Sequence, residues 1–490
     1  MDEKPRQPAN SPDERPTNQR WGVFAMVFGT SWLLYLHRYA FGFIKPAIAK
    51  IPAFNEEQVG ILKQTFAMGS AFGPFSFGNG GAGAAVNAMA ENLVARPGYS
   101  NLELGILDSC FSLSYSLSQF ALGPVTDILG VRLMLPILML LWIFGFLMIA
   151  WAPSFFWLKS AQVSLGLGQS VVFGNINRAS RIWFPNRIRT TLQGLVGVFA
   201  GRAGGMCSGL IFGSLLIGML GLDWQTAVYL FAGAGLMHAV IVIVFYRNSP
   251  HGHPGVNAAE LALLPDDTDS NGAKKMRVGE MLRSLSPRGF ANLGLLSVSS
   301  ILSVIADSIY SGWIPTFVSQ EHGMNYKQMG VMAALPLAGG AIGGFLGGYL
   351  NDLAIRRTGN RRWSRSGVAF AGKGMAAILL FVALIWYDRP YVFCSLLFFV
   401  KLFGDWSLVT SWAVVTDIGG KATATIFSFN NAIAILVGGT LAPLLFGYIS
   451  DEFSWKIVFI TAAVVYALCA VSWLFINCTI PMIKEKPKAP

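Results

Sequence analysis

Long apolar runs separated by short polar segments make up most of the chain. Each run, with at most a residue or two of polar interruption, has about the 20 residues that a helix needs to cross a bilayer. We therefore predict an all-α membrane protein, embedded in a lipid bilayer, with twelve transmembrane helices. They lie at about 21–45, 104–124, 133–152, 155–177, 191–216, 225–246, 290–318, 329–350, 367–387, 391–415, 424–449 and 456–478.

A long polar segment divides the predicted spans into two groups of six. Residues 247–288 have the polarity of a solvated cytoplasmic linker. We interpret residues 21–246 as an N-terminal six-helix bundle and residues 289–480 as a C-terminal six-helix bundle. The Pro-rich residues 1–20 lack the apolar core of a signal peptide and are predicted to be a disordered cytoplasmic tail. Residues 481–490 are predicted to be a C-terminal cytoplasmic tail.

The composition agrees with a membrane protein. Of the 490 residues 53% are hydrophobic and 12% are charged, whereas a soluble chain carries about 25% charged residues. The net charge of +11 comes from short basic clusters between the apolar runs, so we expect no nucleic-acid partner. The five cysteines are scattered without metal-ligand spacing, which indicates neither a disulfide framework nor a metal site.

No catalytic pattern accompanies the spans. The chain lacks the GxxxxGK[ST] motif, so ATP-driven chemistry is unsupported. No Ser/His/Asp set, metal cluster or acid pair is placed convincingly for catalysis. We therefore expect neither an enzyme nor a bound cofactor.

The distribution of basic residues predicts the orientation. Lys and Arg concentrate in the even-numbered connections and in both tails, and the odd-numbered connections hold few. Because basic residues in short loops stay on the cytoplasmic side, we expect both termini in the cytoplasm and the protein in the cell (inner) membrane.

A short motif recurs at matching places in the two groups. Gly123, Asp127 and Arg132 follow the second span, and Asp352 and Arg356 follow the eighth. An acid and an arginine at the cytoplasmic end of a helix can latch two helices in one conformation and release them in another. The alternative is an ordinary charged helix end that obeys the positive-inside rule.

An insertion lengthens the first outer loop. Residues 51–100 include a Gly-rich, uncharged stretch, and Gly60-Ile-Leu with Phe66 is repeated 45 residues later as Gly105-Ile-Leu with Phe111. The segment either covers the outer mouth of a pathway or is a tolerated surface insertion.

The two groups of six spans and the paired motifs resemble the major facilitator superfamily over about 21–480. Within it, the chain is most similar to the anion:cation symporter family of organic-anion transporters. The similar stretches are Tyr35-Leu-His-Arg38, Trp183-Phe184-Pro185, Arg247-Asn-Ser-Pro250, His253-Pro254 through Glu260, Trp313-Ile-Pro315-Thr316-Phe317, and Asn430 and Asn431 before Gly438-Gly439 and Pro443. The organophosphate:phosphate antiporters are the alternative, because Phe111-Ser-Leu-Ser-Tyr115 with Gly123 and Asp127 also resembles their second span.

Arg38 is the leading candidate for binding substrate. A guanidinium stays protonated and is costly at membrane depth, so it should face a polar cavity and hold an anion or an acid. The resemblance implies contact with a substrate carboxylate or phosphate; the alternative is an arginine that snorkels to a headgroup. Tyr35 lies on the same helical face. His37 stands where the symporters often have a proton-carrying aspartate, so it is a candidate coupling group or a bystander.

The fourth span departs from the family pattern. Its members often show Arg, then Gly four residues on and Glu seven residues on, as a second anion contact and a coupling acid. Here these positions are Gln162, Gly166 and Gln169. Glutamine can hydrogen-bond a substrate but cannot titrate. The family's proton mechanism is therefore in doubt, and the coupling ion is open between a proton and sodium.

Among the other charged residues inside predicted spans, Arg202, Asp307, Lys401 and Asp405 are further candidates. Lys401 and Asp405 are spaced i, i+4 and can pair. We hypothesise that Asp307 pairs with Arg38 or Arg202 when the site is empty, with a purely structural pair as the alternative. By resemblance, the antiporters have a phosphate-binding arginine at the position of Asp307, and an acid there would repel phosphate.

These residues predict a monomeric secondary transporter that moves a small organic anion, such as a sugar acid or another carboxylate, by rocking two bundles around a central site. Two alternatives are an organophosphate:phosphate-type antiporter and a membrane sensor that binds the same ligand without transport. Additional candidates for lining the cavity are Tyr115, Tyr310, Asn430 and Asn431.

Overall fold

The structure is a computed structural model. It describes residues 15–50, 98–185, 188, 192–264, 286–420 and 423–482. Most of the 51–100 insertion, both tails beyond these limits and residues 265–285 lie outside the described part, so the predictions made for them stay predictions.

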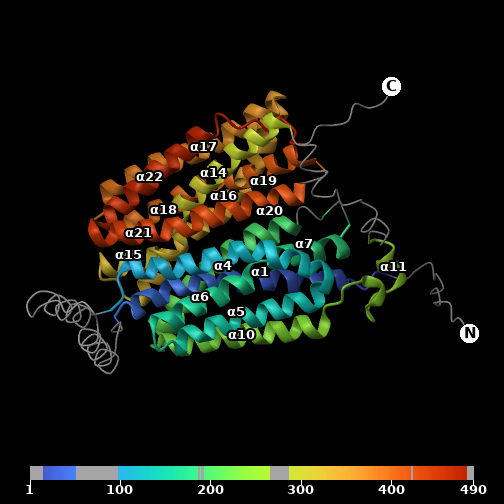
Figure 1. The fold of residues 1–490 in the computed structure, drawn as a ribbon, viewed down its shortest axis with the longest axis horizontal. Helices are drawn as coiled ribbons and strands as arrows, with labels where there is room; N and C mark the ends of the chain where they lie inside the picture. Colours follow the sequence, from blue (N-terminus) through green and yellow to red (C-terminus); the bar gives the residue numbers. More distant parts are fainter. Residues whose placement is uncertain are drawn as a thin grey trace, which may run out of the picture.

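The described residues form long helices that lie side by side, and they contain no β-strand (Figure 1). The helices of the first half are α1 (Gln19–Ile48), α4 (Asn101–Leu129), α5 (Val131–Trp151), α6 (Phe155–Gln169), α7 (Val172–Trp183), α9 (Ala200–Cys207) and α10 (Trp224–Phe245). A short α11 (Ala258–Leu261) follows. The helices of the second half are α14 (Pro287–Gly312), α15 (Ile314–Gln320), α16 (Tyr326–Thr358), α17 (Arg361–Ala383), α18 (Pro390–Gly404), α19 (Trp406–Gly419), α20 (Thr423–Ala434), α21 (Thr440–Glu452) and α22 (Trp455–Ser472).

Nine helical segments within the described residues are long and apolar enough to cross a membrane. One of them, Leu192–Met219, contains α9 between two π-helical stretches, Leu195–Phe199 and Ser208–Met219. Three helical regions lie outside these nine segments. They are α1 with 30 residues, α4 with 29 residues, and the consecutive helices α6 and α7 with 15 and 12 residues. The all-α membrane fold is confirmed, and the helices are consistent with twelve spans.

Capping residues explain why several helices extend beyond the apolar runs. The Ser100 hydroxyl accepts a hydrogen bond from the Glu103 N–H, and the Glu103 carboxylate accepts one in return from the Ser100 N–H. This capping box starts α4 at Asn101, before the predicted span at 104–124. Asn325 and Gln328 form the same box before α16. That helix continues to Thr358 and ends at Gly359, whose φ of 65° is a left-handed conformation that favours glycine.

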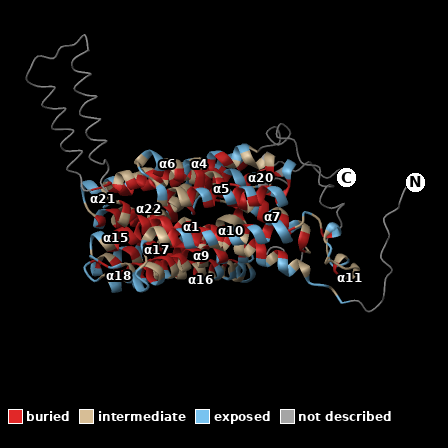
Figure 2. Ribbon diagram, turned by 90° about the horizontal axis from the view of Figure 1, so that it is seen from below, coloured by how far each residue is buried: buried red, intermediate tan, exposed pale blue. Residues whose placement is uncertain are grey.

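The helices are arranged as two bundles, α1 to α10 and α14 to α22 (Figure 1). Buried residues fill the interior of each, and exposed ones lie outside (Figure 2). Many of the exposed residues are large and apolar, such as Phe144 on α5 and Met237 and Val240 on α10. Apolar outer faces are expected where helices contact lipid tails.

The bundles contact each other at the end that holds α15, opposite α11, which we call the distal end (Figure 1). There the backbone N–H groups of Asn101 and Leu102 donate to the Asp451 carboxylate at 3.1 and 2.8 Å. The Ser109 hydroxyl donates to the Thr440 carbonyl oxygen, also across the bundles, at 2.7 Å. Helix α4 packs on α21 with Gly105 directly against the Pro443 backbone. These contacts close the distal end.

Candidate functional site

A cavity of about 350 Å³ lies between the two bundles. The first bundle contributes residues of α1, α4, α6 and α9 to its wall, and the second contributes residues of α14, α19, α20 and α21. Asp108 and Gly312 line the part of the cavity nearer the distal end, and Phe427 and Trp473 line the opposite part. Five serines of α14 face it: Ser299, Ser300, Ser303, Ser308 and Ser311.

Arg38 lies in the cavity wall inside a ring of aromatic side chains. Its guanidinium carbon is 5.0 Å from the ring centre of Tyr35, 4.9 Å from that of Phe111 and 5.1 Å from that of Tyr115. Aromatic faces attract a cation without neutralising it. The Nε of Arg38 donates to the Gln169 side-chain oxygen at 2.8 Å, whereas its Nη2 is buried without a hydrogen-bond partner. Among the described residues no carboxylate pairs with Arg38.

Amide side chains stand elsewhere in the same wall. Gln162 lines the cavity, and its buried Nε2 has no hydrogen-bond partner. Asn431 lines the cavity as well. Asn430 also lines it and is held in place, since it donates to the Ser300 hydroxyl and accepts from the Ser297 hydroxyl, both at 3.0 Å. Amides can contact an oxygen-rich ligand through either donor or acceptor.

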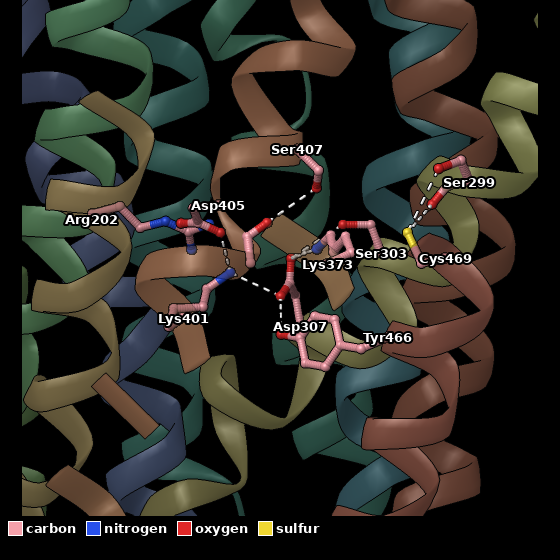
Figure 3. A network of polar contacts seen from close by, with 11 residues as sticks. Arg202, Ser299, Ser303, Asp307, Lys373, Lys401, Asp405, Ser407, Tyr466 and Cys469 are labelled. Carbon is pink, nitrogen blue, oxygen red and sulfur yellow. Dashed lines mark hydrogen bonds and ion pairs between the residues drawn. The ribbon is translucent and has the colours of Figure 1, made fainter. Parts of the chain in front are cut away.

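The second bundle holds a network of buried charges (Figure 3). Asp307 of α14 pairs with the Lys401 ammonium of α18 at 2.9 Å and with the Lys373 ammonium of α17 at 3.7 Å. It also accepts a hydrogen bond from the Tyr466 hydroxyl of α22 at 2.6 Å. Lys401 reaches Asp405, the residue between α18 and α19, at 2.5 Å. Each carboxylate in this network therefore contacts at least one cation.

One ion pair of this network crosses between the bundles. Arg202 of α9 places its Nη2 2.8 Å from Asp405 Oδ2. The pair packs against Gly340 of α16, where a Cβ would lie 2.6 Å from Asp405 Oδ2. A glycine is thus required for the close approach of α16 to the pair.

The cavity carries an excess of positive charge. Its lining includes Arg38, Arg202, Asp108 and Asp307, and the charged residues that pair directly with these are Lys45, Lys373, Lys401 and Asp405. Five cations therefore stand against three carboxylates. Since a low-dielectric interior disfavours unbalanced charge, this arrangement suits a bound anion. The described residues hold no group of three or more His, Cys, Asp or Glu placed to bind a metal ion.

Several sequence predictions are resolved by these contacts. Lys401 and Asp405 do form the expected pair. The hypothesis that Asp307 pairs with Arg38 or Arg202 is wrong, because lysines from α17 and α18 lie closer to it and Arg202 is held by Asp405. Tyr310 is buried beneath the Lys401 ammonium, 5.7 Å from its ring centre, and is not part of the cavity wall.

His37 lies inside the first bundle, away from the cavity. Its Nδ1 is 2.7 Å from the Leu33 carbonyl oxygen, and its Nε2 is 3.0 Å from the Phe231 carbonyl oxygen. The ring packs edge-on against Phe146. Because His37 does not reach the cavity wall, the contacts favour the bystander interpretation over a coupling role.

Three charged residues of the site, Lys373, Lys45 and Asp108, were not predicted from the sequence. Lys373 lies within the apolar run 367–387 and is fully buried in α17. Lys45 and Asp108 form an ion pair between α1 and α4. The available signal was the position of Lys373 and Asp108 inside predicted spans.

The predicted latch residues lie at the α11 end of α4, α5 and α16. The side chain of Asp127 is outside the described part, and Gly123 is in α4. The Arg132 N–H donates to the Asn248 side chain at 2.8 Å. Asp352 and Arg356 are exposed in the last turns of α16, and within the described residues neither forms an ion pair. Their role as a latch stays a prediction.

Two helical bundles with apolar outer faces around a charged central cavity define a multi-pass membrane transporter. The sequence profile of the Major Facilitator Superfamily matches residues 27–431 and, in a second match, residues 296–490. The chain belongs to the major facilitator superfamily.

The relatives and the fold neighbours are transporters. The probable sulfoacetate transporter SauU of Cupriavidus necator is 26% identical over 80% of this chain and 89% of its own length. The hexuronate transporter of Escherichia coli K12 is 25% identical over 77% of this chain and 86% of its own length. A bacterial homologue of the human lysosomal transporter Spinster shares the fold, with a TM-score of 0.70 at 14% identity over 96% of this chain and 99% of that one. These likenesses confirm a transporter and not an enzyme.

Proposed function

We propose that the protein moves a small organic anion, a sugar acid or another carboxylate, across the cell membrane by ion-coupled alternating access. The observation that carries this proposal is Arg38, a partly buried cation in the cavity wall whose buried Nη2 has no partner and which no described carboxylate neutralises. A carboxylate of the substrate would supply the missing charge and the missing hydrogen bond.

Three further observations support an anion. The cavity and its direct ion-pair partners hold five cations and three carboxylates. The unpartnered Gln162 Nε2 and the α14 serines offer hydrogen bonds to hydroxyl groups or to a second acidic group. The named relatives include transporters of sulfoacetate, hexuronate and D-galactonate, all of which are small organic anions.

The proposal includes a cellular location, an orientation in the membrane and an oligomeric state. Arginine and lysine placement favours an inner membrane location with both termini, and hence α11, on the cytoplasmic side. The distal end would then face outward, and the two bundles would rock about the cavity to release the anion. We propose that the transporter acts as a monomer.

Uptake into proteoliposomes tests the proposal. A radiolabelled panel of hexuronates, aldonates, dicarboxylates, sulfoacetate, glycerol phosphate and neutral sugars is offered with and without an inward proton or sodium gradient. We compare the wild type with Arg38→Ala and with Arg389→Ala, an exposed arginine outside the cavity, as the charge-matched control. Gradient-stimulated uptake of a carboxylate or sulfonate that Arg38→Ala reduces to background, and Arg389→Ala does not, is the expected result.

Other outcomes would point elsewhere. Exchange of glycerol phosphate for phosphate would favour an organophosphate:phosphate-type antiporter. Binding of an anion without flux under any gradient would favour a sensor. Uptake of a neutral sugar that is indifferent to Arg38→Ala would contradict the proposal, because Arg38 would then be a structural residue.

A further inference from the structure

Two carboxylates line the described cavity, and their surroundings differ. Asp307 contacts two lysines and also accepts hydrogen bonds from Tyr466 at 2.6 Å and Ser303 at 3.4 Å. Asp108 contacts one group, the Lys45 ammonium. Its side chain is 22% exposed toward the cavity, whereas Lys45 is fully buried. The Asp307 side chain is 19% exposed, so the two acids are about equally accessible, and Asp108 differs in that fewer partners hold it.

Among the described residues, no charged group besides Lys45 forms an ion pair with Asp108. Lys45 of α1 and Gly312 of the α14–α15 junction lie against Asp108 itself. Next to it on α4, Ser109 and Gly105 contact Thr440 and Pro443 of α21, and α6 packs along the same helix. The Lys45 ammonium donates a hydrogen bond to the Asp108 carboxylate. The Lys45 ammonium itself also faces the Trp313 ring at 4.0 Å and the Phe41 ring at 5.6 Å.

The pair lies between the Arg38 site and the closed distal end. Lys45 follows Arg38 by seven residues, which places it about 10 Å further along the same face of α1. Asp108 precedes Phe111, one of the rings around Arg38, by three residues on α4. A Cβ on Gly312 would lie 3.1 Å from Lys45 Nζ and 3.3 Å from Asp108 Oδ2. The second bundle thus packs directly on this pair.

We propose that Asp108 carries the coupling proton and that Lys45, released from Asp108, then adds an unpaired positive charge beside the cavity in which Arg38 binds the anion. A proton from water forms an O–H bond with Asp108, and the ion pair with Lys45 breaks. The net charge of the cavity rises by one, which strengthens its attraction for an anion. By linkage, the bound anion favours protonated Asp108 equally. Proton and anion then bind together, as symport requires.

This inference rests on the proposed anion transport and deepens it. It accounts for the glutamine at position 169, where the resembling family often has an acid, because Asp108 supplies a titratable carboxylate on a different helix. It also connects coupling to conformation, since the Lys45–Asp108 pair lies where α1 and α4 meet Trp313 of the second bundle.

The test uses purified full-length protein with D-galacturonate and sulfoacetate as probes. In weakly buffered solution with a pH indicator, the wild type should take up about one proton per anion bound, and Asp108→Asn should bind the anion without taking up a proton. In proteoliposomes Asp108→Asn should keep counterflow exchange and lose accumulation driven by a proton gradient. For each unit by which the pH rises, the affinity of the wild type for the anion should weaken by up to about tenfold. The affinity of Asp108→Asn for the anion should not depend on pH. Asp388→Asn, an exposed carboxylate, is the matched control.

The outcomes separate this inference from the proposed function. A wild type that moves neither probe under any gradient overturns both. If the wild type accumulates a probe and Asp108→Asn still accumulates it with a proton gradient, the role of Asp108 is overturned and the proposed function is not. Should Asp108→Asn also lose counterflow, Asp108→Glu decides: recovery of proton-driven accumulation supports the inference, and no recovery overturns it.

Discussion

Two charged sites on the cavity, Asp307 in the second bundle and Arg38 in the first, differ in how far the protein compensates their charge. In the second bundle, Asp307 contacts Lys401, Lys373 and Tyr466, so its charge is compensated within the protein. In the first bundle, Arg38 has a glutamine and three aromatic rings around it and no acid among the described residues. Both sites border the same cavity.

The difference separates a structural role from a ligand-binding role. A buried charge with several partners rigidifies the helices that carry it, and removing one partner leaves the others uncompensated. A buried charge without a counter-charge is costly unless a ligand completes it. We therefore expect substitutions in the Asp307 network to change stability most, and substitutions around Arg38 to change anion binding most.

The largest expected effect is the loss of stability in Asp307→Asn. This change leaves Lys373, Lys401 and Arg202 with Asp405 as their one acid, and breaking a buried ion pair costs about 3–5 kcal/mol. The measurement is unfolding of the detergent-solubilised protein by heat or denaturant, followed by tryptophan fluorescence.

A second variant sharpens this prediction. Asp307→Asn combined with Lys373→Met removes one charge of each sign, so the net charge of the network returns to its original value. The double variant should recover part of the lost stability. Equal stability of the single and the double variant would contradict the claim that Asp307 balances Lys373.

The next largest expected effect comes from a substitution that gives Arg38 an acidic partner. In Gln169→Glu, a carboxylate replaces the amide oxygen that now lies 2.8 Å from Arg38 Nε. Arg38 would then resemble the paired cations of the second bundle. We expect the Kd for the transported anion to rise about tenfold to a hundredfold, or by about 1.4–2.8 kcal/mol. Equilibrium binding of the radiolabelled anion measures it.

Position 162 provides the control, because Gln162 lies two helical turns before Gln169 on the same face of α6. Adding Gln162→Arg to Gln169→Glu restores the positive charge of the cavity, so the double variant should regain much of the affinity. Unchanged binding in Gln169→Glu would show that the anion does not contact Arg38.

The sequence predicts the fold well because an apolar run of about 20 residues has few alternatives to a membrane-spanning helix. The predicted span at 329–350 is an example, since α16 covers it completely. Its ends were missed by up to eight residues, because capping by Asn325 and Gln328 and the exposed polar turns to Thr358 extend the helix outside the apolar part.

The site was predictable only as far as its contacts are local. Lys401 and Asp405 are i, i+4, so spacing alone predicted their pair, and the structure confirms it. Arg38 stood out because an arginine inside an apolar run needs a reason. The partners of Asp307 come from α17, α18 and α22, and no spacing along the chain indicates which of several helices approaches α14.

The smallest expected effect concerns a carboxylate that backbone groups satisfy in place of lysines. Glu260 of α11 accepts from the N–H groups of Gln19 and Arg20, which begin α1, and from the Thr17 hydroxyl. Burial alone would raise the pKa of Glu260, but the hydrogen bonds from Arg20, Thr17 and Gln19 outweigh it and hold the pKa below its usual value. Glu260→Gln should therefore weaken the attachment of α11 to α1 by about 1 kcal/mol at neutral pH.

The sign of the pKa shift predicts how this effect depends on pH. A carboxylate with a lowered pKa in the folded state stabilises that state above its unfolded pKa, about 4.3, and this contribution is lost as the pH falls through the folded pKa. Hydrogen–deuterium exchange of the Gln19 and Arg20 amides should be faster in Glu260→Gln than in the wild type at pH 7, and the ratio should approach one in acid. Glu452→Gln, an exposed acid at the distal end, is the control and should leave these amides unchanged. A ratio that stays constant between neutral and acidic pH would mean that the shape of Glu260, and not its charge, holds the start of α1.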